Sequence, residues 1–229
     1  YKTRIGMNLH MQLFEGHVSN YNDLYQVIYN FNWTKILDHK NTFSIKTKLN
    51  SDVIQKQNFC TMKSKDAIVD RIRKETNSRP SIDKRNPDFY IFIYIKDKKI
   101  KVFLNSSGWP LFMRGYRSKI HKAALNESLA AGILKLTNWD KNTALYDSFC
   151  GSGTFLIEAA MDAFKIPPRI LRTFYAFQNW KDFDKKLLGK IIKEEQNKIE
   201  YKEINLHGSD IVSQNIQLAK ESIEKLNLT

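Results

Sequence analysis

The first part of the chain alternates between strand-like and helix-like patterns of apolar residues. Apolar and polar side chains alternate over residues 9–13 and 43–49, which is typical of strands with one buried face. Residues 20–31 and 63–75 instead carry apolar residues three and four positions apart, which indicates amphipathic helices. Two β-prone runs separated by a short turn over residues 89–104 predict a hairpin. We therefore expect an α+β module in this part of the chain.

A break rich in Ser, Gly, Trp and Pro over residues 106–110 separates this module from the rest of the chain. The expected elements after the break are a helix capped by Asn126, a buried strand over residues 144–149, helices over 154–164 and 184–200, a strand over 204–210 and a helix over 216–226. Strands that alternate with helices in this order predict the front half of a doubly wound, Rossmann-like sheet. The fold class is therefore α/β, with two domains, residues 1–106 and residues 107–229.

Composition favours a globular protein with an anionic partner. The apolar runs among the 229 residues are far shorter than the roughly 20 residues that span a bilayer, so we expect no membrane segment. No secretory signal is visible, which favours a cytoplasmic setting. The formal net charge is +13, and the first 106 residues hold 19 basic against 10 acidic side chains. A biased genome would explain the total charge, but not its concentration in one half, so we expect nucleic acid to contact that half.

Cysteine and histidine usage argues against a metal site. The two cysteines, Cys60 and Cys150, form no CxxC pair. The five histidines (His10, His17, His39, His121 and His207) have no spacing that metal ligands use. Cys150 has no general base beside it in the sequence, so we interpret it as a buried cysteine rather than a nucleophile.

The strongest candidate for chemistry is a glycine-rich turn between a strand and a helix. Residues 147–154 read Asp-Ser-Phe-Cys-Gly-Ser-Gly-Thr. Gly151 and Gly153 allow a tight turn and a close approach of a ligand to the backbone. Asp147 suits an ammonium or hydroxyl group, because no lysine follows as in a phosphate-binding loop. A purely structural turn is the alternative interpretation.

This turn resembles motif I of class I S-adenosylmethionine-dependent methyltransferases that modify exocyclic amines of bases. The match continues into Phe-Leu-Ile-Glu-Ala-Ala at residues 155–160. Residues 111–117 and 124–131 are similar to the segment before motif I in the RlmL-type ribosomal RNA guanine methyltransferases. Ser148 and Ala124 stand where that family usually has proline, which affects local rigidity.

The front half resembles the THUMP domain, an RNA-binding module of the same family. The similarity lies in Lys-Asp-Ala-Ile-Val-Asp-Arg at residues 65–71 and in residues 79–88. It implies RNA contacts from basic side chains of this module and of the segment before motif I. The candidate RNA-binding residues are Lys65, Arg71, Arg73, Lys84, Arg85, Arg114 and Arg117.

The resemblance also implies S-adenosyl-L-methionine as cofactor. Asp210 matches the acidic residue that binds ribose hydroxyls, and its distance of 63 residues from Asp147 implies an insertion over residues 165–201. A helix N-cap is the alternative for Asp210, and a surface or capping role is the alternative for Glu127. The candidate cofactor-binding residues are Asp147, Phe149, Gly151, Ser152, Gly153, Thr154, Asp210 and Glu127.

The family's catalytic Asn/Asp-Pro-Pro-Tyr/Phe sequence does not occur in the chain, so no catalytic residue is assigned. We expect a piece of a longer enzyme, truncated at both ends. The resemblance implies methylation of the 2-amino group of a guanine in large-subunit ribosomal RNA. Two alternatives stay open: a non-catalytic RNA-binding fragment, and an adenine-specific DNA or RNA methyltransferase.

Overall fold

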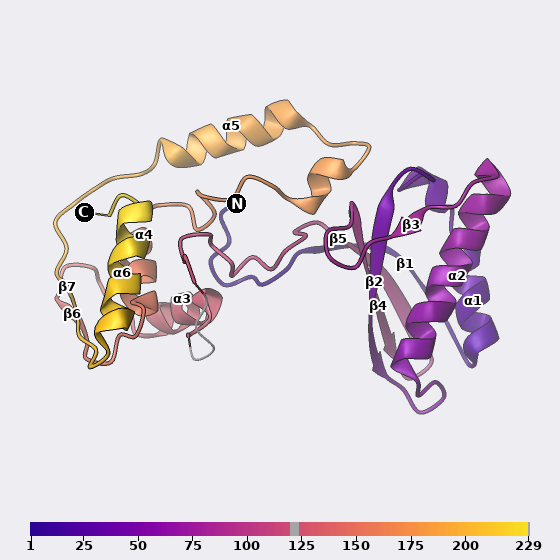
Figure 1. Ribbon diagram of the computed structural model, residues 1–229, viewed down its shortest axis with the longest axis horizontal. Helices are drawn as coiled ribbons and strands as arrows, with labels where there is room; N and C mark the ends of the chain where they lie inside the picture. Colours follow the sequence, from indigo (N-terminus) through magenta and orange to yellow (C-terminus); the bar gives the residue numbers. More distant parts are fainter. Residues whose placement is uncertain (120–123, 229) are drawn as a thin grey trace. The chain divides into compact units, whose positions relative to one another are not determined.

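The computed structural model describes residues 1–119 and 124–228, and it divides into two compact units (Figure 1). The N-terminal unit comprises Asn8–Trp109 and Phe174–Phe183. The C-terminal unit comprises Tyr1–Met7, Pro110–Thr173 and Asp184–Thr229. The chain therefore passes between the units four times. The division into two domains, residues 1–106 and 107–229, stays a prediction. The compact units differ from it, since each also contains a short segment from the other side of that boundary.

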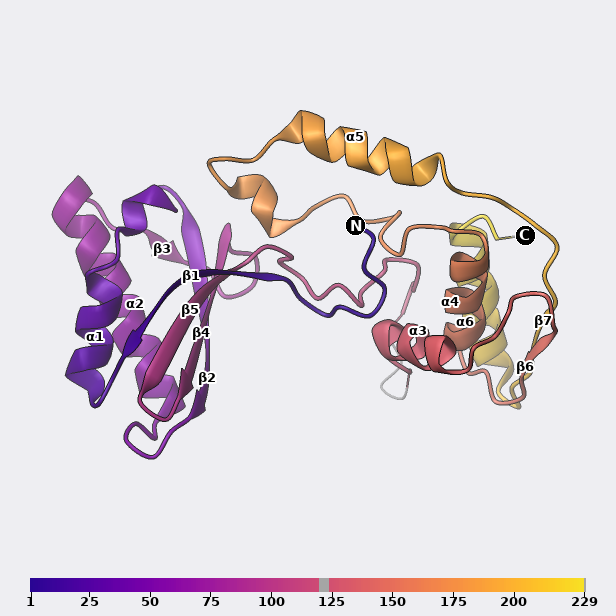
Figure 2. The ribbon, with the colours of Figure 1, turned by 180° about the vertical axis from the view of Figure 1, so that it is seen from behind.

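The N-terminal unit is a five-stranded sheet with two helices on one face. Its elements are β1 (His10–His17), α1 (Tyr21–Tyr29), η1 (Trp33–Lys35), β2 (Thr42–Asn50), α2 (Gln57–Thr76), β3 (Ser81–Ile82), β4 (Phe89–Lys96), β5 (Lys99–Asn105) and η2 (Ala176–Asn179). The strand order is β1-β5-β4-β2-β3, and β2 runs parallel to both β3 and β4. Figures 1 and 2 both place α1 and α2 on the same side of this sheet.

The core of this unit lies between the sheet and the helices. Phe43, Ile91 and Ile93 on the central strands are at most 2% exposed and pack with Ile68 of α2. Burying such side chains contributes roughly 1.5–3 kcal/mol each. The predicted alternation over residues 43–49 and the predicted hairpin are confirmed. The second predicted helix begins at Gln57, six positions before the expected start.

The predicted burial pattern of the first strand is wrong. Residues 10–17 form an edge strand, in which Met11 remains 41% exposed. The register shifts between Gln12 and Phe14, as in a β-bulge. Because of this shift, Phe14 rather than Leu13 pairs with Val102 and stacks on Phe31.

The C-terminal unit is built around two short parallel strands and their helices. Its elements are α3 (Glu127–Leu136), β6 (Leu145–Asp147), α4 (Thr154–Ala163), α5 (Lys185–Gln196), β7 (Leu206–Gly208) and α6 (Ser213–Lys225). Strand β6 pairs with β7 in parallel, and α4 contacts both strands and α6. The core gathers Ile157, Met161 and Phe164 of the α4 region with Leu226. Together the two units confirm the predicted α/β fold class.

Two expectations for this unit are wrong. The strand predicted to be buried over residues 144–149 exposes Tyr146 (70%) and Phe149 (91%), because the helices cover one face of the two-stranded sheet. Tyr146 instead stacks on His207 of β7, with ring centroids 4.5 Å apart. The basic helix predicted over residues 184–200 is shorter (α5), and none of its residues is buried.

Candidate functional site

The glycine-rich loop leaves the carboxyl end of β6 and leads directly into α4. Gly151 and Gly153 have φ angles of +55° and +76°, which disfavour any residue with a Cβ. At Gly153 a Cβ would also lie 3.0 Å from the Cβ of Ala219 on α6. The Gly153 N–H donates to the carbonyl of Cys150 at 2.8 Å, and the Gly153 carbonyl accepts from Ile157 in α4. The loop is therefore a tight turn whose glycines are required by backbone geometry and by helix packing.

Asp210 joins this loop to the next strand–helix connection. The Gly151 N–H donates to Asp210 Oδ2 at 3.0 Å. Asp210 Oδ1 accepts from the Val212 N–H (2.8 Å) and from the amide of Asn215 (3.1 Å). Hydrogen bonds from Val212, Asn215 and Gly151 lower the pKa of Asp210 below its usual value. Asp210 is not the N-cap of α6, which is Val212, although it accepts hydrogen bonds at the start of that helix and from the glycine loop. Its contact with ribose hydroxyls stays a prediction.

Arg117 ties the start of α4 to the start of α3. Its Nη2 donates to Thr154 Oγ1 at 2.7 Å and to the carbonyl of Leu125 at 2.6 Å. Its Nε lies 3.3 Å from Oε1 of Glu127, and the two side chains are 9% and 6% exposed. Burial raises the pKa of Glu127, and the positive charge of Arg117 opposes that shift. A surface role for Glu127 is excluded by this burial, and Arg117 is a poor candidate for RNA contact.

Polar and apolar groups surround the carboxyl ends of β6 and β7. Asp147 ends β6 and accepts from the Phe149 N–H at 3.3 Å. The Phe149 side chain is 91% exposed, and Ile211 beside Asp210 is fully exposed. Parallel sheets bind ligands in the crevice outside their carboxyl ends. Two carboxylates flanked by two exposed apolar side chains suit a ligand with hydroxyl or ammonium groups and a flat apolar part.

Cys150 is buried within the loop (8% exposed), as predicted. Burial, together with the negative charges of Asp147 and Asp210, raises the pKa of its thiol. The thiol is therefore protonated at neutral pH, which disfavours a nucleophilic role.

An apolar cavity of about 540 Å³ lies behind the loop, between α4, β7 and α6. Its lining includes Leu156, Ile157, Ile216 and Ile223. This cavity offers few polar groups and lies on the helix-covered side of the two strands. We therefore place the candidate site at the carboxyl ends of the strands rather than in this cavity.

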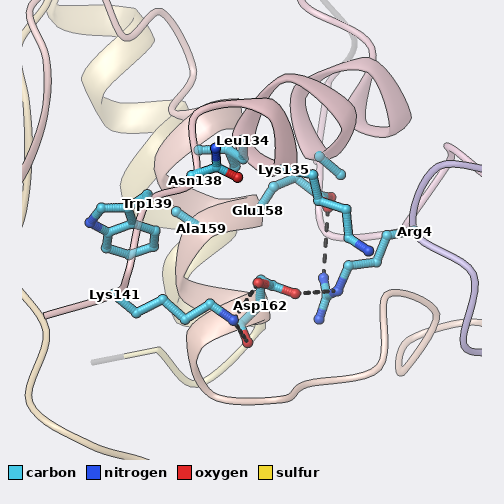
Figure 3. A pocket seen from close by; sticks show the side chains of 10 residues that line it. Arg4, Leu134, Lys135, Asn138, Trp139, Lys141, Glu158, Ala159 and Asp162 are labelled. Carbon is cyan, nitrogen blue, oxygen red and sulfur yellow. Dashed lines mark hydrogen bonds and ion pairs between the residues drawn. The ribbon is translucent and has the colours of Figure 1, made fainter.

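Arg114 is buried in an ion-pair network and does not reach solvent, which contradicts its predicted RNA contact. It is 1% exposed, and its Nε donates to Glu158 of α4 at 3.1 Å. Its Nη2 donates to the carbonyl of Arg4, and the Arg4 side chain pairs with Asp162 at 3.0 Å. Figure 3 shows Asp162 between Arg4 and Lys141, beside a cavity of about 180 Å³. This network fixes the N-terminal segment against α4.

The five other candidate RNA-binding residues lie on or after α2. Arg73 and the loop residues Lys84 and Arg85 are exposed. Lys65 pairs with Asp66 at 2.8 Å, and Arg71 pairs with Glu75 at 2.7 Å. The structure therefore gathers these basic side chains on one unit, although two of them are partly neutralised.

The sequence did not indicate Arg4, Asn215 or Ile211 as parts of the site or its support. Ile211 directly follows Asp210, a predicted cofactor-binding residue, and this adjacency could have indicated it. Among the described residues, no cluster of three or more His, Cys, Asp or Glu side chains could hold a metal ion, and His121 lies outside those residues. Within the same described part of the chain, no helix has the length and apolarity needed to cross a membrane.

Comparison with protein families matches both units. A family model described as an RMKL-like methyltransferase domain matches residues 114–229, and a THUMP domain model matches residues 18–105. The ribosomal RNA large subunit methyltransferase K/L of Shewanella sp. (strain W3-18-1) is 35% identical over 227 residues, which cover 97% of this chain and 32% of that protein. The chain thus spans about a third of the length of the curated relatives that it matches.

Solved structures show the same arrangement of elements. The structure of SMU.472, described as a putative methyltransferase complexed with SAH, has a TM-score of 0.84 and 26% sequence identity, covering 97% of this chain and 59% of that chain. A predicted N6-adenine-specific DNA methylase from Listeria monocytogenes has a TM-score of 0.86, covering 99% of this chain and 60% of its own. Its identity of 22% shows similarity of fold alone.

Proposed function

The chain belongs to the family of RMKL-like methyltransferase domains and carries a THUMP domain ahead of it, and on this premise we propose that it forms part of an S-adenosyl-L-methionine-dependent enzyme that methylates large-subunit ribosomal RNA. We further propose the 2-amino group of a guanine as the acceptor. The N-terminal unit would hold the RNA, and the C-terminal unit would hold the cofactor. The family's catalytic tetrapeptide is absent from these 229 residues, so we assign no catalytic residue to them.

The observation that carries this proposal is the hydrogen bond from the Gly151 N–H to Asp210 Oδ2. A carboxylate offers about four acceptor positions, and Gly151, Val212 and Asn215 already use three of those on Asp210. One position on Oδ2 therefore remains for a ribose hydroxyl. Asp147 would accept from the ammonium group at the methionine end, and Phe149 and Ile211 would flank the adenine ring.

The backbone of the loop would complete the cofactor site. The main chain of Gly151, Ser152 and Gly153 would lie close to the ligand, and the two glycines would present no Cβ to it. Thr154 begins α4, and through Arg117 it fixes the loop relative to Glu127. Glu127 would act on the cofactor site by holding Arg117. When bound, the cofactor supplies the methyl group, and the residues of this chain bind and orient it.

Isothermal calorimetry with S-adenosyl-L-methionine and SAH tests the cofactor site directly on this chain. We expect binding that Asp210→Ala weakens by about tenfold or more, because the variant removes the charged acceptor proposed for the ribose hydroxyl. Glu200→Ala, an exposed site on the same unit, is the control. The absence of heat with a folded wild-type chain would contradict the proposal. In an enzyme that contains this chain, labelled methyl transfer should reach ribosomal RNA, whereas transfer to DNA alone would favour the adenine-specific alternative.

A further inference from the structure

The face of the five-stranded sheet that α1 and α2 leave open carries aromatic rings and lysines in register. Phe92 of β4 lies between Phe103 of β5 and Lys46 of β2. One step along, Tyr94 of β4 lies between Lys101 and Lys48. We call these six residues the ring–lysine grid. Neighbouring strands are about 4.8 Å apart, and positions on one face of a strand are about 6.7 Å apart, so the six side chains form one continuous surface.

The grid points away from the helices. The alternate residues of the same strands, such as Ile91, Ile93 and Val102, are at most 2% exposed and pack in the core beneath α1 and α2. Side chains of successive strand residues point to opposite faces, so Phe92, Tyr94 and Phe103 lie on the other face. Figures 1 and 2 place both helices on a single side of the sheet. The three lysines of the grid are exposed, and the three rings are half-buried among their neighbours.

The charge of this face is strongly positive. Among the described residues, neither Lys46 nor Lys48 forms an ion pair with a carboxylate. Lys101 lies 3.6 Å from Glu15, and both side chains are about half exposed, so this pair is weak. On α2, two of the five basic residues, Lys65 and Arg71, are each paired with a carboxylate below 3 Å. Lys63, Arg73 and Lys74 of α2 have no carboxylate partner among the described residues, so both faces carry uncompensated positive charge, and the aromatic rings in register with the lysines distinguish the grid.

The rings lie close enough to act together. The centroids of Phe92 and Phe103 are 6.0 Å apart, and the ring of His10 lies 5.1 Å from that of Phe92. Aromatic faces stack on unpaired bases, and lysines beside them contact the phosphates of the same strand. A duplex hides the faces of its bases, and an acidic peptide would use the lysines without the rings. The combination of rings and free cations thus fits a single-stranded nucleic acid.

We propose that the ring–lysine grid binds an unpaired segment of RNA, two or three nucleotides long, by stacking bases on Phe92, Phe103 and Tyr94 while Lys46, Lys48 and Lys101 contact its phosphates. This inference rests on the proposed ribosomal RNA substrate and deepens it by naming unpaired nucleotides as the part that this face contacts. It adds a candidate RNA surface on the side of the sheet opposite α2.

Fluorescence anisotropy of the whole chain with labelled octauridylate tests the proposal. The ring variant, Phe92→Leu with Phe103→Leu, keeps apolar volume but removes both rings. The loss of one stacked base should weaken binding roughly 5- to 150-fold. The lysine variant, Lys46→Gln with Lys48→Gln, should lower the slope of log Kd against log salt concentration by about 0.7 per lysine. Phe59→Leu and Lys74→Gln, exposed residues of α2, are matched controls that should change Kd less than twofold.

A second probe separates stacking from charge. An RNA octamer with 2-aminopurine should lose fluorescence on binding to the wild-type chain and should keep it with the ring variant. Circular dichroism melting checks that each variant folds. If the ring variant does not fold, the lysine variant and the wild-type 2-aminopurine signal decide the outcome. The proposal would be overturned if the folded ring variant bound octauridylate as wild type does, or if the lysine variant kept the wild-type salt slope. Absent quenching of 2-aminopurine by the wild-type chain would also overturn it. So would an affinity for an RNA duplex equal to that for octauridylate, or competition by polyglutamate equal to that by RNA.

Calorimetry with SAH on the same preparations keeps this proposal distinct from the proposed function. A chain that binds SAH but shows no difference between the ring variant and wild type contradicts the grid alone. A chain that binds octauridylate through the grid but gives no heat with either cofactor form contradicts the methyltransferase site instead.

Discussion

Gly151 and Asp210 are 59 positions apart in the sequence, and the Gly151 N–H donates to Asp210 Oδ2 at 3.0 Å. Two main-chain hydrogen bonds lie beside this contact, from Cys150 to the Ser209 carbonyl (2.9 Å) and from Ser209 to the Asp147 carbonyl (3.0 Å). They extend the parallel pairing of β6 and β7 past the strand ends and into the glycine loop. The shape of the loop therefore depends on the neighbouring connection, and the Asp210 carboxylate is held by the loop that follows β6, whereas the Asp147 carboxylate accepts from Phe149 in its own loop.

Gly153→Ala should destabilise the C-terminal unit for two reasons. The backbone at this position is left-handed, which a residue with a Cβ disfavours, and the new Cβ would lie 3.0 Å from the Cβ of Ala219. The backbone effect alone costs about 1–2 kcal/mol. Urea unfolding followed by circular dichroism measures the change. Gly189→Ala in α5 is the control, since its Cβ would meet nothing within 4 Å, and it should gain up to about 1 kcal/mol. Equal effects of the two substitutions would contradict the packing of α4 against α6.

Arg117→Lys should weaken SAH binding by roughly tenfold, because lysine keeps the charge but cannot bridge Thr154, Leu125 and Glu127 with a planar fork. Octauridylate binding should stay within twofold of wild type, since the Arg117 side chain is 9% exposed. Calorimetry and anisotropy measure the two affinities. The opposite result, in which RNA affinity falls and SAH affinity is kept, would restore Arg117 as an RNA-binding residue.

Glu158→Gln should lower the free energy of unfolding by about 3–5 kcal/mol, because it leaves the buried guanidinium of Arg114 without its carboxylate partner. The exposed pair of Lys165 and Glu200 provides a matched control, and Glu200→Gln should change stability far less than Glu158→Gln, because solvent screens this pair. Denaturant titration distinguishes these outcomes. A loss below about 1 kcal/mol for Glu158→Gln would mean that Arg114 is solvated and available to RNA.

Cys150 should react slowly with iodoacetamide at pH 8, because its pKa is raised by burial and by the charges of Asp147 and Asp210. The thiolate is the reactive form, so the rate should rise with pH and reach half its maximum above pH 9, the ordinary value for the thiol. Mass spectrometry of the peptide that contains Cys150 follows the reaction, and the denatured chain is the reference. Faster alkylation in the folded chain than in the denatured one would indicate an activated thiol.

Local sequence determined the parts of this protein that depend on neighbours along the chain. The alternation from Phe43 to Leu49 predicted which side chains of β2 face the core, since successive strand residues point to opposite faces. The paired glycines predicted the sharp turn into α4, because few other residues adopt positive φ. The strand–loop–helix order and the family resemblance gave the fold class before any contact was known.

Only the tertiary structure decided the roles of residues whose partners are distant in the sequence. Local sequence does not distinguish an arginine that contacts RNA from one that is buried in an ion pair. The burial of Arg114 depends on Glu158, which lies 44 positions away in the sequence. In the same way, β2 and β5 do not follow one another in the chain, and the strand order brings Lys48 and Lys101 to either side of Tyr94. Pairing between distant segments is a cooperative property of the whole packed unit, so no window of local sequence contains it.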